Sequence, residues 1–235
     1  PAILASLFDI KQYREYLHRQ EDCQIVMIGY SDSTKCGGYL SACWSLHEAQ
    51  QKIHDVAASY GVKLTFFHGR GGSLGRGGGP AARGILSLPA QTFDGALRLT
   101  EQGEVLSARY DDPIIAHRHL EQVVWSSLLA IGEPKAPDKQ DWSDLMKQLA
   151  VTSYRKYREL IEKPQFIEFF RQATPIIEIE QLPIGSRPAR RGHGGSLSDL
   201  RAIPWVFSWT QCRCLIPAWY GIGYAVDEFL HNTEL

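Results

Sequence analysis

Residues 24–30 (QIVMIGY) and 62–67 (VKLTFF) are the two stretches of the sequence that decide the fold. Each is an apolar run of the kind that is typical of a strand buried on both faces of a sheet. The intervening residues, about 38–60, carry apolar side chains near helical spacing, and Gly61 follows where a helix C-cap glycine belongs. Strand, helix and strand at these lengths predict a βαβ unit, with parallel strands and a right-handed crossover.

The rest of the sequence predicts mostly helix. Asp112 and Pro113 are typical of the N-cap and the first position of a helix. The predicted elements are helices at about 112–131, 139–162 and 165–173, a last helix from near Pro217, and a third buried strand at 203–209 (IPWVFSW) despite its proline. The sequence therefore indicates an α/β fold with an excess of helix, which we expect to be a single unit over residues 1–235.

Composition and charge exclude several classes of protein. The chain of 235 residues is 44% hydrophobic and 22% charged, as in ordinary globular domains, and its net charge of −1 gives no field for nucleic acid or an anionic membrane. Five cysteines without zinc-site spacing predict reduced thiols in the cytoplasm. There is no membrane-length apolar run and no leader, and Pro1 at the start predicts a processed or truncated product.

Polar and basic side chains follow each of the first two predicted strands. Asp32 and Lys35 come after the first strand, and His68, Arg70 and Arg76 come after the second. Because the carboxyl ends of parallel strands share one edge of a sheet, where ligands bind in such folds, we expect these five residues on one rim.

The glycine-rich stretch 69–79 is the most unusual part of this rim. Seven of its eleven residues are glycine, which lets backbone N–H groups approach a ligand closely and form an anion-binding nest. It matches neither a Walker loop nor the dinucleotide pattern. Two interleaved arginines favour a phosphate or carboxylate ligand over the alternative, a flexible solvated loop. We expect this loop to be mobile without an anion.

Each single residue also has a purely structural interpretation. Asp32 fits a helix cap, Lys35 a solvated lysine, and His68 a satisfied core histidine. The cluster of Arg187, Arg190, Arg191 and Arg201 in the Pro-, Gly- and Ser-rich segment 183–199 and just beyond it fits a solvated loop. The residues alone therefore indicate only a phosphorylated or carboxylated substrate on an α/β rim.

Five motifs in the sequence resemble those of the phosphoenolpyruvate carboxylase family. They lie at 25–35 (IVMIGYSDSTK), 67–80 (FHGRGGSLGRGGGP), 100–104 (TEQGE), 185–189 (GSRPA) and 200–205 (LRAIPW), in family order. Together they span nearly the whole chain. By this resemblance the chain is identified as an internal fragment of the catalytic region of a family member.

The resemblance implies a fold, a reaction and partners. The fold is the helix-rich part of a TIM-type (β/α) barrel of the phosphoenolpyruvate/pyruvate-binding kind. The enzyme is a lyase of anaplerotic carbon dioxide fixation, which joins bicarbonate to phosphoenolpyruvate and gives oxaloacetate and phosphate. The resemblance also implies Mg²⁺ or Mn²⁺ as cofactor, a cytoplasmic location, and a full-length parent that is a homotetramer, with neither nucleic acid nor membrane as partner.

The resemblance assigns roles position by position. Asp32 corresponds to a metal-binding carboxylate, and Arg76 to the catalytic arginine of a mobile loop. The other residues implied to line the substrate and phosphate site are Lys35, His68, Arg70, Arg187 and Arg201, with Gly71, Gly72, Gly75 and Gly77 of the loop backbone.

Two departures from the family keep an alternative open. Cys36 stands where the family usually has an acidic residue beside the lysine, and a thiol does not hold the Lys35 ammonium. The chain is also several times shorter than family members. It lacks a second metal-binding carboxylate, a Thr-Ala-His-Pro motif and the C-terminal part of an inhibitor pocket. The alternative is a non-catalytic fragment that retains only substrate- and phosphate-binding elements.

Overall fold

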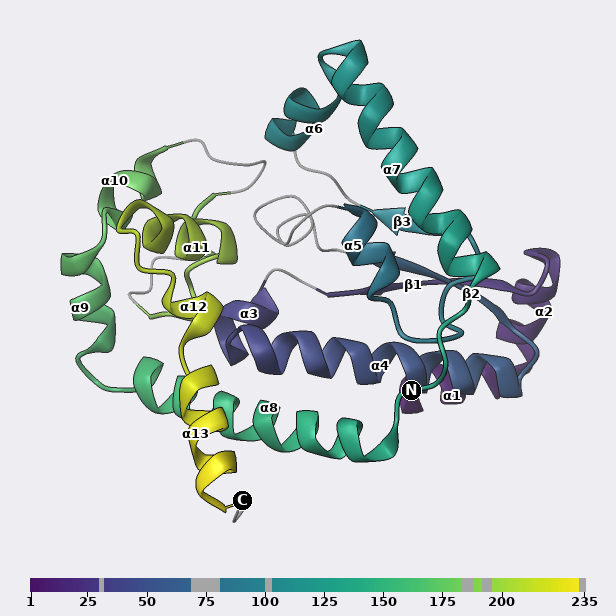
Figure 1. The fold of residues 1–235 in the computed structure, drawn as a ribbon, viewed down its shortest axis with the longest axis horizontal. Coiled ribbons are helices and arrows are strands. Elements are labelled where there is room, and N and C mark those ends of the chain that lie inside the picture. Colours follow the sequence, from purple (N-terminus) through teal and green to yellow (C-terminus); the bar gives the residue numbers. More distant parts are fainter. Residues whose placement is uncertain (30–31, 69–80, 100–102, 183–187, 192–195, 233–235) are drawn as a thin grey trace. The chain divides into compact units, whose positions relative to one another are not determined.

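The computed structural model describes residues 1–29, 32–68, 81–99, 103–182, 188–191 and 196–232. The chain divides into two compact units, Pro1–Tyr30 with Ser45–Lys139, and Ser31–Trp44 with Gln140–Leu235. We call them unit 1 and unit 2 and describe each by itself; Figure 1 labels their elements. The single unit expected from the sequence stays a prediction.

Unit 1 holds a small parallel sheet and its helices. Its elements are α1 (Ala2–Phe8), α2 (Lys11–Arg19), β1 (Cys23–Ile28), most of α4 (Tyr39–Ser59), β2 (Lys63–His68), α5 (Ala81–Leu86), β3 (Arg98–Leu99), α6 (Gly103–Tyr110) and α7 (Pro113–Gly132). The strand order is β1-β2-β3, and both pairs are parallel. Cys23 pairs with Lys63 and Ile28 with His68, so the predicted parallel strands joined by a helix are confirmed.

Local backbone signals explain where two helices of unit 1 begin and end. Gly61 has φ +66°, and the N–H groups of Gly61 and Val62 bond to the carbonyls of Ala58 and Ala57, which closes α4 in a Schellman motif. At the start of α7, Asp112 Oδ1 accepts from the N–H groups of Ile114 and Ile115 at 2.8 and 3.1 Å. Both ends were predicted from the sequence.

One face of the sheet in unit 1 is packed against helices. Phe8, Leu17, Ala57, Leu64 and Phe66 belong to a single buried cluster drawn from α1, α2, α4 and β2. The prediction that both strands are buried on both faces is wrong for β1. Its Ile25 and Met27 are 48% and 44% exposed, because within the described residues β1 is an edge strand and these two side chains lie on the face opposite that of Leu64 and Phe66.

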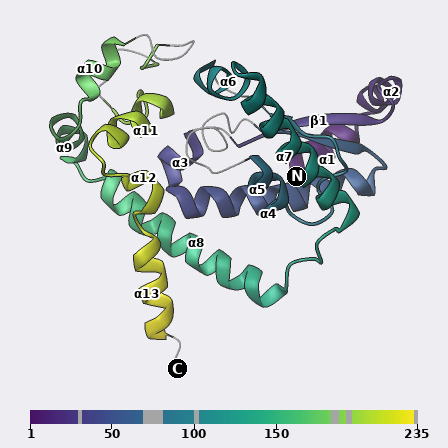
Figure 2. The same cartoon turned by 45° about the horizontal axis from the view of Figure 1, so that its top comes forward.

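Unit 2 is helical in the part of the chain that the structure describes. Its elements are α3 (Asp32–Gly37), the start of α4, α8 (Gln140–Ile161), α9 (Phe166–Ala173), α10 (Ile176–Gln181), α11 (Ala202–Gln211), α12 (Ile216–Trp219) and α13 (Ile222–Asn232). Figures 1 and 2 both show α13 lying beside α8, with which it is in contact.

The third buried strand predicted at 203–209 is wrong, because these residues form helix α11. Pro204 is the third residue of the helix, in the first turn, where the missing N–H has no intrahelical partner to lose. Ala202, Trp205 and Trp209 are buried at helical spacing, whereas a strand buried on both faces would show no such period.

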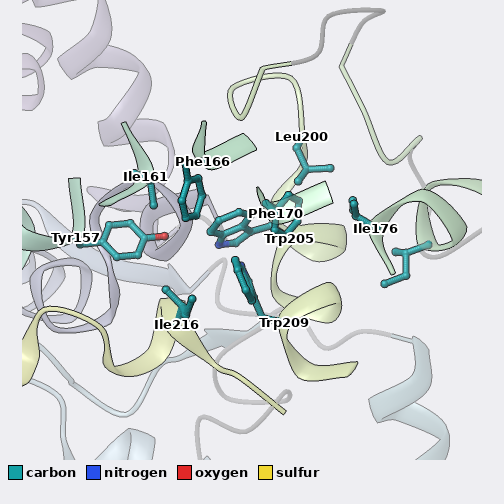
Figure 3. Packing of buried hydrophobic residues seen from close by; sticks show 10 residues of the cluster. Tyr157, Ile161, Phe166, Phe170, Ile176, Leu200, Trp205, Trp209 and Ile216 are labelled. Atoms are coloured by element: carbon teal, nitrogen blue, oxygen red, sulfur yellow. The ribbon is translucent and has the colours of Figure 1, made fainter. Parts of the chain in front are cut away.

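Aromatic residues form the core of unit 2 (Figure 3). The rings of Phe170 and Trp205 have centroids 4.7 Å apart, and Trp205 meets Trp209 edge to face at 5.5 Å. Tyr157 of α8 is fully buried at the edge of this cluster. Burial raises the pKa of its hydroxyl far above the ordinary value. Tyr157 therefore stays protonated and acts as a hydrogen-bond donor.

The architecture is thus α/β, mostly helical, with a small parallel sheet. Among the described residues the sheet is open and has three strands, so it is no closed barrel. A search of those residues finds no helix with the length and apolarity that a membrane crossing requires. The glycine-rich stretch 69–79 lies outside the described residues, so the expectation that it is mobile stays a prediction.

Candidate anion-binding site

The site begins at α3, the short helix at the start of unit 2. Asp32 and Lys35 lie one turn apart on α3, so their side chains meet, with Lys35 Nζ 3.5 Å from Asp32 Oδ1. Helix α3 also contacts α11, which follows the Arg-containing segment 183–199. The residues predicted after the first strand are therefore held against the second half of the chain.

The ammonium of Lys35 is buried and is held by two hydrogen bonds and an ion pair. Its side chain is 3% exposed, and Nζ donates to the carbonyls of Leu197 and Leu200 at 3.2 and 2.6 Å. Lys35 Nζ also forms an ion pair with Asp32 Oδ1, although that oxygen has no hydrogen-bond partner among the described residues. The structure thus gives Lys35 an anchoring role for the segment before Arg201, instead of the solvated position that a lone lysine usually takes.

Tyr157 of α8 forms a hydrogen bond with helix α3. Its hydroxyl donates to the Lys35 carbonyl at 2.8 Å within the buried core. In addition, Arg158 Nη1 donates to the carbonyl of Cys36 at 3.2 Å. Backbone carbonyls at the end of α3 are therefore satisfied by side chains of α8, which fixes the helix that carries Asp32 and Lys35.

The two described stretches 188–191 and 196–201 pair with each other. Arg190 and Leu200 form an antiparallel bridge, flanked by bonds from Arg191 N to Asp199 O (2.8 Å) and from Arg201 N to Ala189 O (3.0 Å). Because side chains alternate between the faces of paired backbone, Arg191 and Arg201 lie on one face as diagonal neighbours, and Arg190 lies on the other.

Each arginine of these two stretches has a different environment. Arg190 Nε donates to Glu180 Oε1 at 2.6 Å, and Arg191 Nη2 donates to Asp32 Oδ2 at 2.6 Å. Arg201 Nε is buried and has no hydrogen-bond partner among the described residues. A buried guanidinium donor without a partner is costly, so Arg201 is the group here best suited to receive an anion.

Asp199 is a carboxylate held by hydrogen bonds from its own turn. Ser196 donates to Asp199 Oδ2 through its hydroxyl at 2.6 Å and through its backbone N–H at 3.2 Å. These bonds, and then the nearby charges of Arg190 and Lys35, hold the pKa of Asp199 below its ordinary value. Asp199 thus closes the turn of 196–199 that presents the Leu197 carbonyl to Lys35.

His68 belongs to unit 1, where it ends β2. It is 2% exposed and lies on the same strand face as Leu64 and Phe66, whose ring centroid is 6.4 Å from that of His68. That face is the one packed against helices. The structure therefore places His68 as the structural interpretation predicted, toward the core, and its catalytic assignment stays a prediction.

Among the residues predicted for the site, the structure brings Asp32 and Lys35 into contact, and it holds Leu200, the residue before Arg201, against Lys35. The remaining predicted residues lie outside the described part of the chain: Arg70, Arg76, Gly71, Gly72, Gly75, Gly77 and Arg187. Sequence reasoning missed the ion pair of Arg191 with Asp32. Its two members are 159 positions apart, and no local pattern links them.

The described residues do not by themselves form a metal centre. No group of three or more His, Cys, Asp or Glu side chains in the described ranges is arranged to hold a cation. Asp32, the predicted ligand, is instead paired with Arg191 and Lys35. A single carboxylate already neutralised by two cationic groups falls short of what Mg²⁺ usually takes.

The fold places the chain among the α/β proteins with a parallel sheet, and its second unit gathers arginines and a buried lysine at one place. Comparison with known proteins is more specific. The family model of phosphoenolpyruvate carboxylase matches residues 1–235, and the chain belongs to this family.

Curated relatives agree with this assignment. The chain is 51% identical to the phosphoenolpyruvate carboxylase of Thermosynechococcus vestitus, with 99% of the chain and 23% of the relative covered. It is 50% identical to that of a Synechococcus strain, covering 99% and 22%, and 45% identical to that of Roseiflexus castenholzii, covering 99% and 25%. The chain therefore spans about a quarter of the length of these relatives.

Proposed function

We propose that this chain is the part of a phosphoenolpyruvate carboxylase that binds the phosphoryl and carboxylate groups of the substrate. The complete reaction joins bicarbonate to phosphoenolpyruvate and releases oxaloacetate and phosphate. The family match over the whole chain supports the assignment. The observation that carries it is Arg201, whose buried Nε has no partner among the described residues.

The proposed roles follow the chemistry of the reaction. Bicarbonate oxygen attacks phosphorus, the bond to the enol oxygen breaks, and carboxyphosphate and the enolate of pyruvate form. Carboxyphosphate then releases carbon dioxide, and the enolate carbon captures it. Arg201 and Arg187 hold the phosphoryl oxygens, Arg70 and Arg76 stabilise developing negative charge, and His68 lines the substrate. The contacts of Lys35 favour a positioning role.

The glycine-rich loop would supply backbone N–H groups to the same anion through Gly71, Gly72, Gly75 and Gly77. We further propose that Asp32 contributes one carboxylate to a Mg²⁺ or Mn²⁺ site whose other ligands lie outside these 235 residues. Bound there, the cation would stabilise negative charge on oxygen.

The proposal extends to the whole protein. The sheet of unit 1 would be one part of a TIM-type (β/α) barrel, completed by segments that the relatives possess and this chain does not span. The substrates would be phosphoenolpyruvate and bicarbonate, and the complete protein would be a cytoplasmic homotetramer. No nucleic acid or membrane partner is proposed.

A second candidate is a non-catalytic fragment that keeps only the anion-binding elements. Two observations favour it: the chain spans about a quarter of its relatives' length, and the described residues lack a metal centre. Both candidate functions include the anion site. Only the first includes turnover of phosphoenolpyruvate to oxaloacetate.

The anion site is tested by calorimetry with inorganic phosphate on the purified chain. Arg201→Gln should weaken binding about 10- to 100-fold, because a hydrogen bond to a charged group contributes roughly 1.5–3 kcal/mol. Arg190→Gln is the matched control, since Arg190 pairs with Glu180, which keeps Arg171 at 3.3 Å. Equal phosphate affinity in the Arg201→Gln variant and the unsubstituted chain would overturn the proposed site.

A further inference from the structure

We propose that Asp32 locks Arg191, so that an anion bound at Arg201 gains a second arginine only when Asp32 releases it. The inference deepens the proposed function and rests on its anion site. In this proposal Arg191 binds a phosphate or carboxylate ligand only after its ion pair with Asp32 has broken. Until then the Asp32 carboxylate takes the place of the ligand at the Arg191 guanidinium.

The first observation is the contact itself. Arg191 Nη2 lies 2.6 Å from Asp32 Oδ2, the length of a strong charge-assisted hydrogen bond. Arg191 is 50% exposed and Asp32 is 30% exposed, so a small anion in solvent can reach the pair. A carboxylate presents to a guanidinium the same oxygens that a phosphate or carboxylate ligand presents, and the two compete for the same donors.

The second observation is the direction of the backbone. The bridge of Arg190 with Leu200 puts Arg191 and Arg201 on one face, as diagonal neighbours. Cβ atoms in that relation lie roughly 7–8 Å apart, within reach of two long side chains that share one anion. Arg190 lies on the opposite face, paired with Glu180, and cannot replace Arg191.

The third observation is that Asp32 is itself fixed. Lys35 Nζ stands 3.5 Å from its Oδ1, and Lys35 is anchored by the carbonyls of Leu197 and Leu200. Loss of the Asp32 charge therefore frees Arg191 while two of the three contacts of Lys35 remain. The segment that carries Arg201 stays attached to α3.

The test is a double-mutant cycle on phosphate binding, measured by calorimetry with inorganic phosphate. Asp32→Asn should tighten binding about three- to tenfold, because one further charge-assisted bond becomes available; the effect is smaller than at Arg201 because Arg191 is half exposed and its bond is screened by water. Arg191→Gln alone should change the affinity less than about twofold, because a locked arginine contributes little. In Asp32→Asn/Arg191→Gln the gain should disappear, and in Asp32→Asn/Arg190→Gln it should persist.

Each other outcome is decisive. A gain that persists in Asp32→Asn/Arg191→Gln would show that Asp32 only repels the anion, and it would overturn the lock. Weaker binding in Arg191→Gln alone would show that Arg191 is never locked. No gain in Asp32→Asn also overturns the lock. Should Asp32→Asn fail to fold by circular dichroism, Asp32→Ser removes the same charge and keeps an oxygen that suits a first helical turn.

Failure of the proposed function gives a different result. If Arg201→Gln leaves phosphate binding intact, the anion site has been assigned to the wrong residue, and the proposed competition between Asp32 and the anion for Arg191 is refuted as well. If Arg201→Gln abolishes binding but the cycle shows no coupling between Asp32 and Arg191, the anion site stands and only the lock is wrong.

Discussion

Lys35 takes a different position from the one its chemistry alone suggests. A lysine beside an anion site is expected to point its charge at the ligand, yet here three protein oxygens surround the ammonium. Burial of a charge is tolerated only when the charge is paired and hydrogen-bonded, and Lys35 meets both conditions. At the proposed anion site, Lys35 would therefore act on the anion through the backbone that carries Arg201.

Lys35→Met should destabilise the chain by about 2–4 kcal/mol, because one buried and one part-buried carbonyl lose their donor and Asp32 loses one of its two cations. Lys163→Met, at an exposed position just after α8, should stay within about 0.5 kcal/mol. Urea unfolding followed by circular dichroism measures both. A Lys35→Met variant as stable as the Lys163→Met control would contradict the anchoring role.

Tyr157 links stability to alkaline pH. Its pKa is raised by burial above the unfolded value of 10.0, so its stabilising contribution is complete below about that pH and is lost as the pH rises further. Tyr157→Phe removes the bond to the Lys35 carbonyl and should cost about 1 kcal/mol at pH 7.

The pH profile of the free energy of unfolding checks this assignment. The difference between the unsubstituted chain and Tyr157→Phe should shrink above pH 10, because only the tyrosine loses stability on ionisation. A difference that stays constant from pH 7 to pH 11 would show that Tyr157 does not titrate with unfolding.

At the scale of elements, α8 and α13 meet at a glycine. Gly221 precedes α13 with φ +92°, and a Cβ there would lie 2.5 Å from the Ser153 carbonyl of α8. Both the left-handed backbone and the close approach require glycine. This contact lets the start of α13 lie directly on α8.

Gly221→Ala should destabilise the chain by roughly 2–4 kcal/mol, through left-handed strain and the clash with the Ser153 carbonyl. Gly223→Ala, two positions later, is the control: its added methyl group would meet no atom within 4 Å, and φ is not left-handed. Because alanine favours helix over glycine by up to about 1 kcal/mol, that control should be neutral or stabilising. Thermal unfolding of both variants tests this prediction. Similar melting temperatures would show that position 221 does not require glycine.

The sequence could predict those helices and strands that are determined by residues within or next to them. The parallel pair β1 and β2 follows from apolar runs with a helix between them, and Gly61 and Asp112 mark helix ends by their own backbone chemistry. Helix α11 was missed because an apolar run that contains Trp205 and Pro204 fits a buried strand as well as a first helical turn.

The candidate site was predictable only in part, for a physical reason. Asp32, Lys35 and Arg201 could be named from their positions after strands and by resemblance. The partners that define their roles are distant in sequence. Lys35 meets Leu197 and Leu200 across 162 and 165 positions, and Arg191 meets Asp32 across 159. Such contacts arise from packing and leave no periodic pattern.

At the scale of the whole molecule, we expect the 235-residue chain alone to make no oxaloacetate. The described residues provide no metal centre, and general acid–base groups, which typically contribute about 10²–10⁴-fold, are few at the site. An assay that couples oxaloacetate reduction to NADH oxidation by malate dehydrogenase measures turnover. Phosphate calorimetry on the same sample shows whether the chain is folded and competent to bind. Bicarbonate-dependent turnover would refute the fragment alternative.

Unit 2 is discontinuous, and this has a consequence for the order of events on the ribosome. Lys35 emerges 165 positions before its acceptor at Leu200. At a synthesis rate of about 5–20 residues per second, roughly 8–33 seconds separate the two. During that interval α3 has neither the carbonyls that its lysine needs nor the aromatic core that covers it. Strands β1, β2 and β3 of unit 1 have all emerged by then, so these strands should be able to pair before Lys35 is buried.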